Sequence, residues 1–284
     1  MATQRRFHEL DVFASGPLTG NPLAVVHDAE GLGDDELQRL ANWTNLSETT
    51  FLLPPSDPRA DYRVRIFTPA AELPFAGHPT LGSARAWLAG GGEPQDPTTV
   101  VQECGVGLVP VRRDGERLAF AAPPLIRSGA LEASETAELA TVLGLDPGDV
   151  VAAAWVDNGP GWRALRLRSA EAVLAVEPPA GDVGPFDVGL VGPHPPGGEC
   201  AVEVRAFFGD GTGTVREDPV TGSLNASLAQ WLTAEGVLDL PYVAAQGTRL
   251  GRAGRVHVSS DDTGTIWVGG RAAVTVSGTI SVDA

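Results

Sequence analysis

The chain has 284 residues, 43% of them hydrophobic, and a formal net charge of −16. It is long enough for two ordinary domains with their own cores. Nucleic acid and acidic membrane surfaces require clustered positive charge, so the composition argues against both as partners. No apolar run approaches the ~18 residues of a membrane span, and no apolar signal core follows the N-terminus. We therefore expect a cytoplasmic protein.

All 20 basic residues are arginines. A Schiff-base enzyme, including the usual pyridoxal phosphate chemistry, and a Walker-type phosphate loop each need a lysine amine, so both classes are excluded. The two cysteines, Cys104 and Cys200, are not spaced as metal ligands, and a cytoplasmic disulfide would be unusual. We expect each to be a small buried apolar residue, and we expect no metal site.

The first half of the chain reads mostly as short strands separated by turn signals. Apolar residues at helical spacing after an acidic start predict a helix over residues 34–44. Asp114-Gly115 predicts a hairpin turn between the last two strands of this half. The expected strands cover residues 7–13, 23–26, 49–53, 62–67, 100–111 and 117–121.

The segment Ala122–Pro124 suggests the first domain boundary. Residues 178–198 are rich in proline and glycine and predict an irregular segment. The Gly-rich residues 209–213 form an incomplete nucleotide fingerprint, so we interpret them as a flexible loop between a strand and a helix. The other expected elements are helices near 134–143 and 171–176, strands over 150–156, 162–167 and 202–208, and short strands within 243–282.

One stretch of the sequence occurs twice. The segments Val64–Phe67 and Val204–Phe207 are followed, at the same spacing, by proline-containing segments that begin at His78 and Asp218. At a fixed shift of 140 residues, nine of the 26 positions from Val64 to Ala89 are identical. A long-period repeat of this kind indicates two copies of one unit. We therefore predict two similar halves that face each other.

Each copy of the repeat predicts a strand, a loop and a helix. Proline suits the first helical position, so Pro79 and Pro219 place His78 and Asp218 at equivalent N-cap positions. Helix N-termini attract anions, and two of them would meet across the cleft between the halves. Asp218 alone is readily explained as an ordinary cap, but histidine is a poor cap. His78 in the equivalent place therefore favours a functional site.

Glu48 comes between the 34–44 helix and the 49–53 strand. One interpretation is an exposed carboxylate at the start of a strand, which is common. The other is a general base, placed where the end of a strand meets the cleft. The spacing of the residues leaves both interpretations open.

Four motifs together resemble the PhzF-like phenazine biosynthesis family, and the resemblance runs over nearly the whole chain. They are Thr19–Pro22, Asn45–Glu48, Glu72–Pro79 and Glu217–Ser223. The resemblance implies the α+β fold of diaminopimelate epimerase: two similar pseudo-symmetric domains, each a curved, mostly antiparallel sheet around a central helix, with the active site in the cleft between them. We place the domains at residues 1–122 and 123–284, and we leave open that the last strand returns to the first domain. The resemblance also implies a homodimer.

The best-studied activity of this family is a cofactor-independent isomerisation of trans-2,3-dihydro-3-hydroxyanthranilate, in which a proton moves between two ring carbons. The resemblance implies that Glu48 carries the proton and that His78 and Asp218 assist it as catalytic residues. It also implies a small anionic substrate and no cofactor. The residues that it implies for substrate binding are Ser47, Gly77, Gly159, Gly222 and Ser223.

Two other classes of function stay open. The same fold is expected to support amino-acid or hydroxyproline-like epimerases and dehydratases. Racemases of this fold that use no cofactor have a pair of cysteines at the two helix starts, where this chain has His78 and Asp218. A two-thiol racemase is therefore disfavoured, whereas a one-base epimerase is not. The third class is a non-catalytic small-molecule binding protein, against which the intact family motifs argue.

Overall fold

The computed structural model describes residues 3–181, 183–209 and 213–282. The chain divides into two compact units: unit 1 is Met1–Ala121 with Gly269–Ala284, and unit 2 is Ala122–Val268. Both units combine many strands with few helices, which confirms the expected α+β class. The last strand of the chain, Ile266–Val282, belongs to unit 1 from Gly269 onward. That two domains, separated after residue 122, fold independently of each other stays a prediction.

Unit 1 is a closed barrel of eight strands. In order around the ring, they are β1 (Thr3–Val12), β2 (Asn21–Val26), β3 (Thr49–Leu53), β4 (Tyr62–Phe67), β6 (Thr99–Cys104), β7 (Gly107–Asp114), β8 (Arg117–Ala121) and β17 (Ile266–Val282), which pairs with β1 again. The β2–β3 and β4–β6 pairs are parallel. Closure of the ring leaves none of these strands at a free sheet edge.

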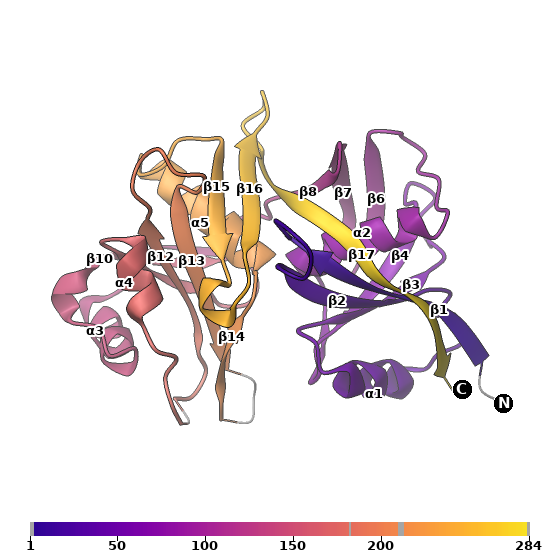
Figure 1. Ribbon diagram of the computed structural model, residues 1–284, viewed down its shortest axis with the longest axis horizontal. Coiled ribbons are helices and arrows are strands. Elements are labelled where there is room, and N and C mark those ends of the chain that lie inside the picture. The colour runs from indigo at the N-terminus through magenta and orange to yellow at the C-terminus, as the bar shows by residue number, and fades with distance from the viewer. Residues whose placement is uncertain (1–2, 182, 210–212, 283–284) are drawn as a thin grey trace. The chain divides into compact units, whose positions relative to one another are not determined.

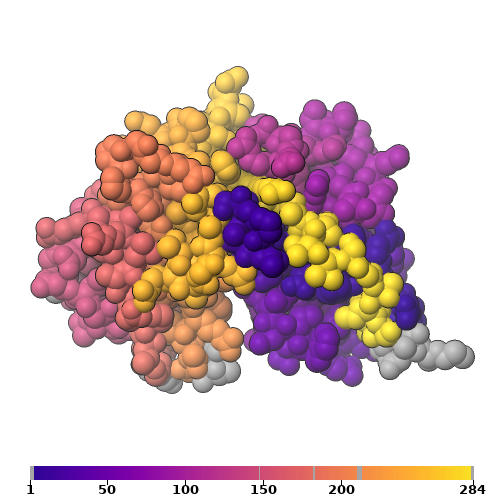
Figure 2. Space-filling model, in the orientation of Figure 1, coloured from indigo at the N-terminus to yellow at the C-terminus, as the bar shows by residue number. Residues whose placement is uncertain are grey.

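Strands from the two ends of the chain lie side by side in this barrel. Figure 2 shows the yellow C-terminal strand against indigo N-terminal residues, as the antiparallel pairing of β1 with β17 requires. A short strand, β5 (Glu72–Leu73), pairs with the end of β4. The helix α1 (Asp34–Thr44) packs its buried Leu37 and Ala41 against a cluster that contains Phe51 and Phe67.

The helix α2 (Gly77–Ala89) fills the barrel. It contacts β1 to β4 and β6 to β8, and Figure 1 shows it among these strands. Most of its residues are small or apolar, and buried residues occur on every side of it, as expected of a helix in a core. Gly82 allows close packing, because a Cβ atom there would lie 2.4 Å from Leu23 Cδ2. The barrel therefore holds the first turn of α2 in a fixed place.

Unit 2 repeats the order of pairings found in unit 1. In both units, the successive strand pairs are antiparallel, parallel, antiparallel, antiparallel, parallel and antiparallel. The strands that make these pairs in unit 2 are β10 (Val150–Asp157), β11 (Arg163–Leu167), β12 (Asp187–Pro193), β13 (Val202–Gly209), β14 (Val215–Asp218), β15 (Tyr242–Gln246) and β16 (Gly254–Ser260). The helix α5 (Gly222–Ala234), mostly buried, follows β14 in the chain as α2 follows β5 in unit 1.

The remaining elements of unit 2 lie around this sheet. β9 (Arg127–Ala130) pairs with β10, and Ser169 caps the helix α4 (Ala170–Ala175) by accepting a hydrogen bond from Ala172. The core contains side chains from α3 (Ala133–Val142), α4, β11, β12 and β13. Two short 3₁₀ helices, η1 (Pro147–Asp149) and η2 (Thr248–Leu250), complete the unit.

Several predicted elements differ from the structure. The segment 178–198 is not irregular throughout, because it contains β12, whose glycines allow Leu224 and the Ser169 carbonyl to pack close to the strand. The last part of the chain is not only short strands, since β17 has 17 residues. The strand expected over 100–111 is two strands, β6 and β7.

The loop at 209–213 precedes the strand β14, not a helix, and its central residues 210–212 lie outside the described part of the chain. Within the part of the chain that the structure describes, no helix is both long and apolar enough to cross a membrane.

Candidate active site

Glu48 and His78 come together in unit 1. Glu48 lies between α1 and β3, and His78 is the second residue of α2. Glu48 Oε2 is 3.4 Å from His78 Nδ1, and the exposed fractions of the two side chains are 14% and 3%. Burial lowers the pKa of His78 to about 3, against a smaller opposing effect of a hydrogen bond with the Pro22 backbone. The imidazole is therefore neutral near pH 7, and the contact is not an ion pair.

A tight loop before β2 supports this histidine. Nδ2 of the fully buried Asn21 is 3.4 Å from His78 Nδ1. The Asp11 carboxylate accepts hydrogen bonds from the backbone amides of Thr19 (2.9 Å) and Gly20 (2.7 Å). Only glycine fits at position 20, because a Cβ atom would lie 2.1 Å from the Val12 carbonyl oxygen. The Thr19–Pro22 motif thus places Asn21 beside His78.

Asp218 belongs to a buried hydrogen-bond network in unit 2. Thr221 Oγ1 donates to Asp218 Oδ2 at 2.5 Å. The Gln246 amide group donates to Thr221 Oγ1 (2.9 Å) and to the Asp218 carbonyl (3.2 Å). Its oxygen accepts from the Thr221 backbone amide and from Asn225 Nδ2. The end of β14 and the start of α5 are therefore fixed together by β15.

Ser223 is the second residue of α5 and is held by the loop between β10 and β11. Trp162 Nε1 donates to Ser223 Oγ at 3.1 Å, and Asn158 Nδ2 donates to the Ser223 carbonyl at 3.0 Å. The Asp157 carboxylate accepts hydrogen bonds from the backbone amides of Gly159 and Gly161, both at 2.7 Å. Gly159 therefore lies in the loop that docks on Ser223.

The N-cap predictions for His78 and Asp218 were wrong. α2 begins at Gly77 with Ala76 as its N-cap, and α5 begins at Gly222 with Thr221 as its N-cap. Proline is tolerated beyond the first helical position, because the first four helical N–H groups have no intrahelical partner. Asp218 instead ends β14, where it pairs with Ala206.

Matching ion pairs show how the two units correspond. Arg65 binds Glu72 through two hydrogen bonds, of 2.7 and 2.6 Å, and Arg205 binds Glu217 in the same way at 3.0 and 2.7 Å. Each arginine also lies over the ring of the phenylalanine two residues further along its strand. The two glutamates therefore occupy equivalent positions.

This correspondence corrects the fixed shift of 140 residues. Phe67 pairs with Glu72, and Phe207 with Glu217, so the connection in unit 2 is five residues longer. The sixth residue after the glutamate is His78 in unit 1 and Ser223 in unit 2. The position equivalent to His78 is therefore Ser223, and Asp218 corresponds to a leucine.

The structure thus forms two groups from the expected site residues. Ser47 and Gly77 directly precede Glu48 and His78 in unit 1, and Gly222 directly precedes Ser223 in unit 2. The expectation that the two groups share one cleft stays a prediction. Of the supporting residues, Asn21 and Thr221 lie within the expected motifs, and Asn158 directly precedes the expected Gly159. Asp11, Trp162 and Gln246 were not expected at the site.

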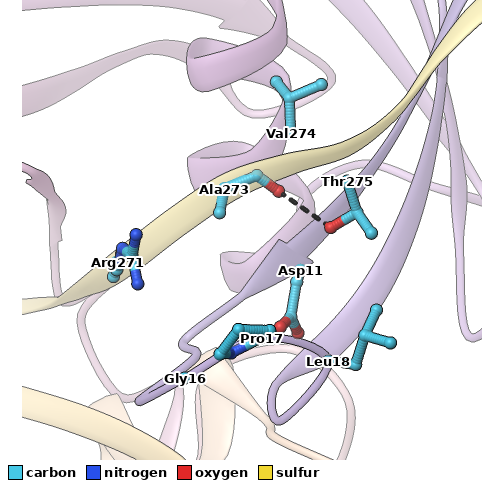
Figure 3. A pocket seen from close by; sticks show the side chains of 8 residues that line it. All are labelled: Asp11, Gly16, Pro17, Leu18, Arg271, Ala273, Val274 and Thr275. Atoms are coloured by element: carbon cyan, nitrogen blue, oxygen red, sulfur yellow. Dashed lines mark hydrogen bonds between the residues drawn. The ribbon is translucent and has the colours of Figure 1, made fainter.

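Two pockets lie outside the expected site residues, since neither is lined by Glu48, His78, Asp218 or Ser223. One, of about 200 Å³, is lined by Asp11, the Gly16–Leu18 turn and β17 residues, and Figure 3 shows the Asp11 carboxylate beside that turn. The other, of about 490 Å³, is formed mainly by Pro193–Ala201 in unit 2. Among the described residues, no cluster of three or more His, Cys, Asp or Glu side chains is arranged to hold a metal ion.

Comparisons with known proteins agree with this fold. A Bacillus anthracis crystal structure of a phenazine biosynthesis protein of the PhzF family matches with a TM-score of 0.81, at 23% identity over 98% of this chain and 99% of the other. "Antisense-enhancing sequence 1" of Schizosaccharomyces pombe is 35% identical over 97% of this chain and 98% of its own length. Trans-2,3-dihydro-3-hydroxyanthranilate isomerase of Pseudomonas aeruginosa is 34% identical over 91% of both chains.

These similarities define the protein as an isomerase. It belongs to the phenazine biosynthesis-like protein family PhzC-PhzF, whose model matches residues 10–279.

Proposed function

We propose that this isomerase moves a carbon-bound proton within a small carboxylate, with Glu48 as the group that carries the proton and without a cofactor. The observation that carries the proposal is the 3.4 Å approach of Glu48 Oε2 to His78 Nδ1 in a nearly buried setting. A relative at 34% identity is named for the isomerisation of trans-2,3-dihydro-3-hydroxyanthranilate, so this compound is the first substrate to test.

Glu48 acts first as a base and then as an acid. It removes a proton from one carbon and returns it to another, a role that typically contributes ~10²–10⁴-fold to the rate. Asn21 Nδ2 can only donate, so it favours the tautomer of neutral His78 in which Nδ1 accepts, and Nδ1 can then accept a hydrogen bond from the Glu48 carboxyl group once Glu48 has taken up the proton. Because His78 lies in the first turn of α2, the positive end of the helix dipole also favours its neutral form.

The residues at the start of α5 bind the substrate carboxylate under this proposal. The first N–H groups of a helix lack intrahelical partners and favour an anion. Gly222 and Ser223 form that first turn, and Ser223 adds a hydroxyl group. Asp218 assists the proton transfer, in keeping with its hydrogen bond from Thr221.

The test is proton exchange in D₂O, followed by NMR. Wild-type protein is incubated with trans-2,3-dihydro-3-hydroxyanthranilate, then with a panel of small cyclic acids and amino acids. Glu48→Gln keeps the shape of the side chain and removes the base, so we expect turnover to fall by ~10²–10⁴-fold or more. Glu93→Gln, at an exposed position of the same unit, is the matched control and should retain full activity.

Each outcome decides a part of the proposal. Isomerisation of the first compound that is lost in Glu48→Gln supports both the mechanism and the substrate. Glu48-dependent exchange into another acid keeps the mechanism and replaces the substrate, and inversion at the exchanged carbon would make the protein a one-base epimerase. Full activity of Glu48→Gln would contradict the assignment of the base.

A two-thiol racemase is not supported by the residues at the helix starts. The second residues of α2 and α5 are His78 and Ser223. Cys104 ends β6, and Cys200 precedes β13. Burial raises the pKa of both thiols, which disfavours the reactive thiolate form.

A further inference from the structure

We propose that Trp162 is a positioning residue that fixes the Ser223 hydroxyl group as a hydrogen-bond donor, and so selects a carboxylate over its amide. The inference rests on the proposed function of Ser223 in binding the substrate carboxylate. Its basis is the 3.1 Å hydrogen bond from Trp162 Nε1 to Ser223 Oγ.

The donor and acceptor capacities of the two groups fix the direction of this hydrogen bond. An indole N–H can only donate, whereas a hydroxyl group can both donate and accept. Ser223 Oγ must therefore accept from Trp162, which leaves its own proton for another partner. Among the residues that the structure describes, none accepts that proton, and Ser223 is only partly buried. The hydroxyl proton is thus available to a ligand.

The loop that carries Trp162 is well fixed. The Asp157 carboxylate closes it by accepting from two backbone amides, and Val156 N–H donates to the Trp162 carbonyl at 3.0 Å. Trp162 itself is 4% exposed, so its ring is held by packing. Asn158 of the same loop donates to the Ser223 carbonyl. One loop therefore positions both the backbone and the side chain of Ser223.

This arrangement favours ligand groups that only accept hydrogen bonds. The N–H groups of the first turn of α5 are donors, and the indole engages the hydroxyl oxygen so that Ser223 presents a donor too. A carboxylate accepts from all of them. A carboxamide in the same orientation would direct one N–H group toward a donor, and it lacks the charge favoured by the helix terminus. Trp162 thereby contributes to selection by charge and by hydrogen-bond polarity.

The matched variants are Trp162→Phe and Trp155→Phe. Both remove an indole N–H and keep an aromatic ring in unit 2. The Trp155 indole N–H is buried and donates to no partner among the described residues, so Trp155→Phe controls for the loss of the larger ring. Ser223→Ala, alone and combined with Trp162→Phe, completes a double-mutant cycle.

A first measurement tests the hydrogen bond without any substrate. The protein has six tryptophans, so its indole ¹H–¹⁵N spectrum is simple, and the signal lost in Trp162→Phe identifies Trp162. We expect Ser223→Ala to shift this signal by more than any other indole signal. An unshifted Trp162 signal would overturn the inference, whatever the substrate is.

The second measurement concerns recognition of the carboxylate. Trp162→Phe should raise KM by about 2- to 10-fold, the usual effect of one neutral hydrogen bond, and change kcat less than KM. It should also reduce the preference for the carboxylate over the matching carboxamide. Trp155→Phe should change neither KM nor this preference. In the Ser223→Ala background, Trp162→Phe should have no further effect on KM. If Trp162→Phe and Ser223→Ala raised KM by independent factors that multiply in the double variant, Trp162 would contribute packing alone, and the inference would be overturned.

The two proposals fail in different ways. If Glu48→Gln exchanged protons as fast as the wild type, the proposed mechanism would be contradicted. The results for the indole signal and for the double-mutant cycle would be unaffected. A double-mutant cycle without coupling would contradict the role of Trp162 and leave Glu48 as the base.

Discussion

Thr221 Oγ1 donates a 2.5 Å hydrogen bond to Asp218 Oδ2, so the carboxylate at the end of β14 is tied to the N-cap residue of α5. Gln246 Nε2 donates to the same hydroxyl oxygen and thereby directs its proton to Asp218. A hydroxyl group with both bonds formed fixes the carboxylate in one orientation, which is what a group that assists proton transfer requires.

Thr221→Val should therefore reduce activity without removing Asp218. A hydrogen bond to a charged group contributes about 1.5–3 kcal/mol, so we expect kcat/KM to fall ~10- to 100-fold for the compound that the exchange assay identifies. Thr221→Ser keeps the hydroxyl group and should stay close to wild type. Equal activities for the two variants would show that this hydrogen bond does not serve catalysis.

The equivalent ion pairs Arg65–Glu72 and Arg205–Glu217 predict unequal effects on stability. The Arg205 and Glu217 side chains are 1% and 3% exposed, whereas Arg65 and Glu72 are 26% and 43% exposed. Removing one partner of a buried pair costs about 3–5 kcal/mol, and an exposed pair contributes about 0–1 kcal/mol. Glu217→Gln should thus lower the free energy of unfolding in urea far more than Glu72→Gln. Similar losses for the two variants would contradict this account.

Much of the fold follows from local patterns in the sequence. The helix over 34–44 has the predicted bounds, because an acidic first turn and apolar residues at helical spacing mark it clearly. The strand at 49–53 also has its predicted bounds, and the Asp114-Gly115 hairpin is confirmed. β12 escaped prediction because its glycines serve close packing rather than turns.

The site was less predictable, because its geometry depends on contacts between distant segments. A comparison at a fixed shift cannot detect the five extra residues between β13 and β14, and it therefore matched His78 with Asp218. Aligning the two Glu-x-Pro-x-x-Gly segments directly would have matched His78 with Ser223. No periodic signal marks Trp162 or Gln246, since each reaches the site from another strand or loop.

The loop that supports Asn21 predicts a sharp difference between two nearby glycines. A Cβ atom at Gly20 would lie 2.1 Å from the Val12 carbonyl oxygen, which belongs to a paired strand and cannot easily move. At Gly16 the nearest atom would be 3.9 Å away. Gly20→Ala should therefore destabilise the protein by about 1–3 kcal/mol or more, while Gly16→Ala should stay within about 0.5 kcal/mol.

Gly20→Ala should also reduce activity more than its effect on stability explains. The displaced loop carries Asn21, whose side chain lies 3.4 Å from His78 Nδ1. The comparison is made at a temperature where both variants are fully folded, as judged by circular dichroism. Wild-type kcat/KM in folded Gly20→Ala protein would separate the loop from the function of His78.

A buried pair of histidines in unit 1 predicts that the protein loses stability in mild acid. His27 Nε2 and His8 Nδ1 are 3.1 Å apart, and both side chains are buried. Burial, together with His8 and Arg6, lowers the pKa of His27 to about 4, although Asp28 opposes the shift. Burial and Arg6 also lower the pKa of His8.

The sign of the effect follows from proton binding. Between about pH 6.5 and 4 the unfolded chain protonates its histidines, whereas folded His27 stays neutral, so the unfolded state binds more protons and the free energy of unfolding falls as the pH falls. The contribution of His27 reaches about 3 kcal/mol near pH 4. His27→Gln removes one of the titrating groups and should make the dependence between pH 6.5 and 4 less steep in urea unfolding, while His8 and His78, whose pKa values are also lowered, keep part of it. Parallel curves for the variant and the wild type would show that His27 does not cause the loss, and would assign it to other groups such as His78.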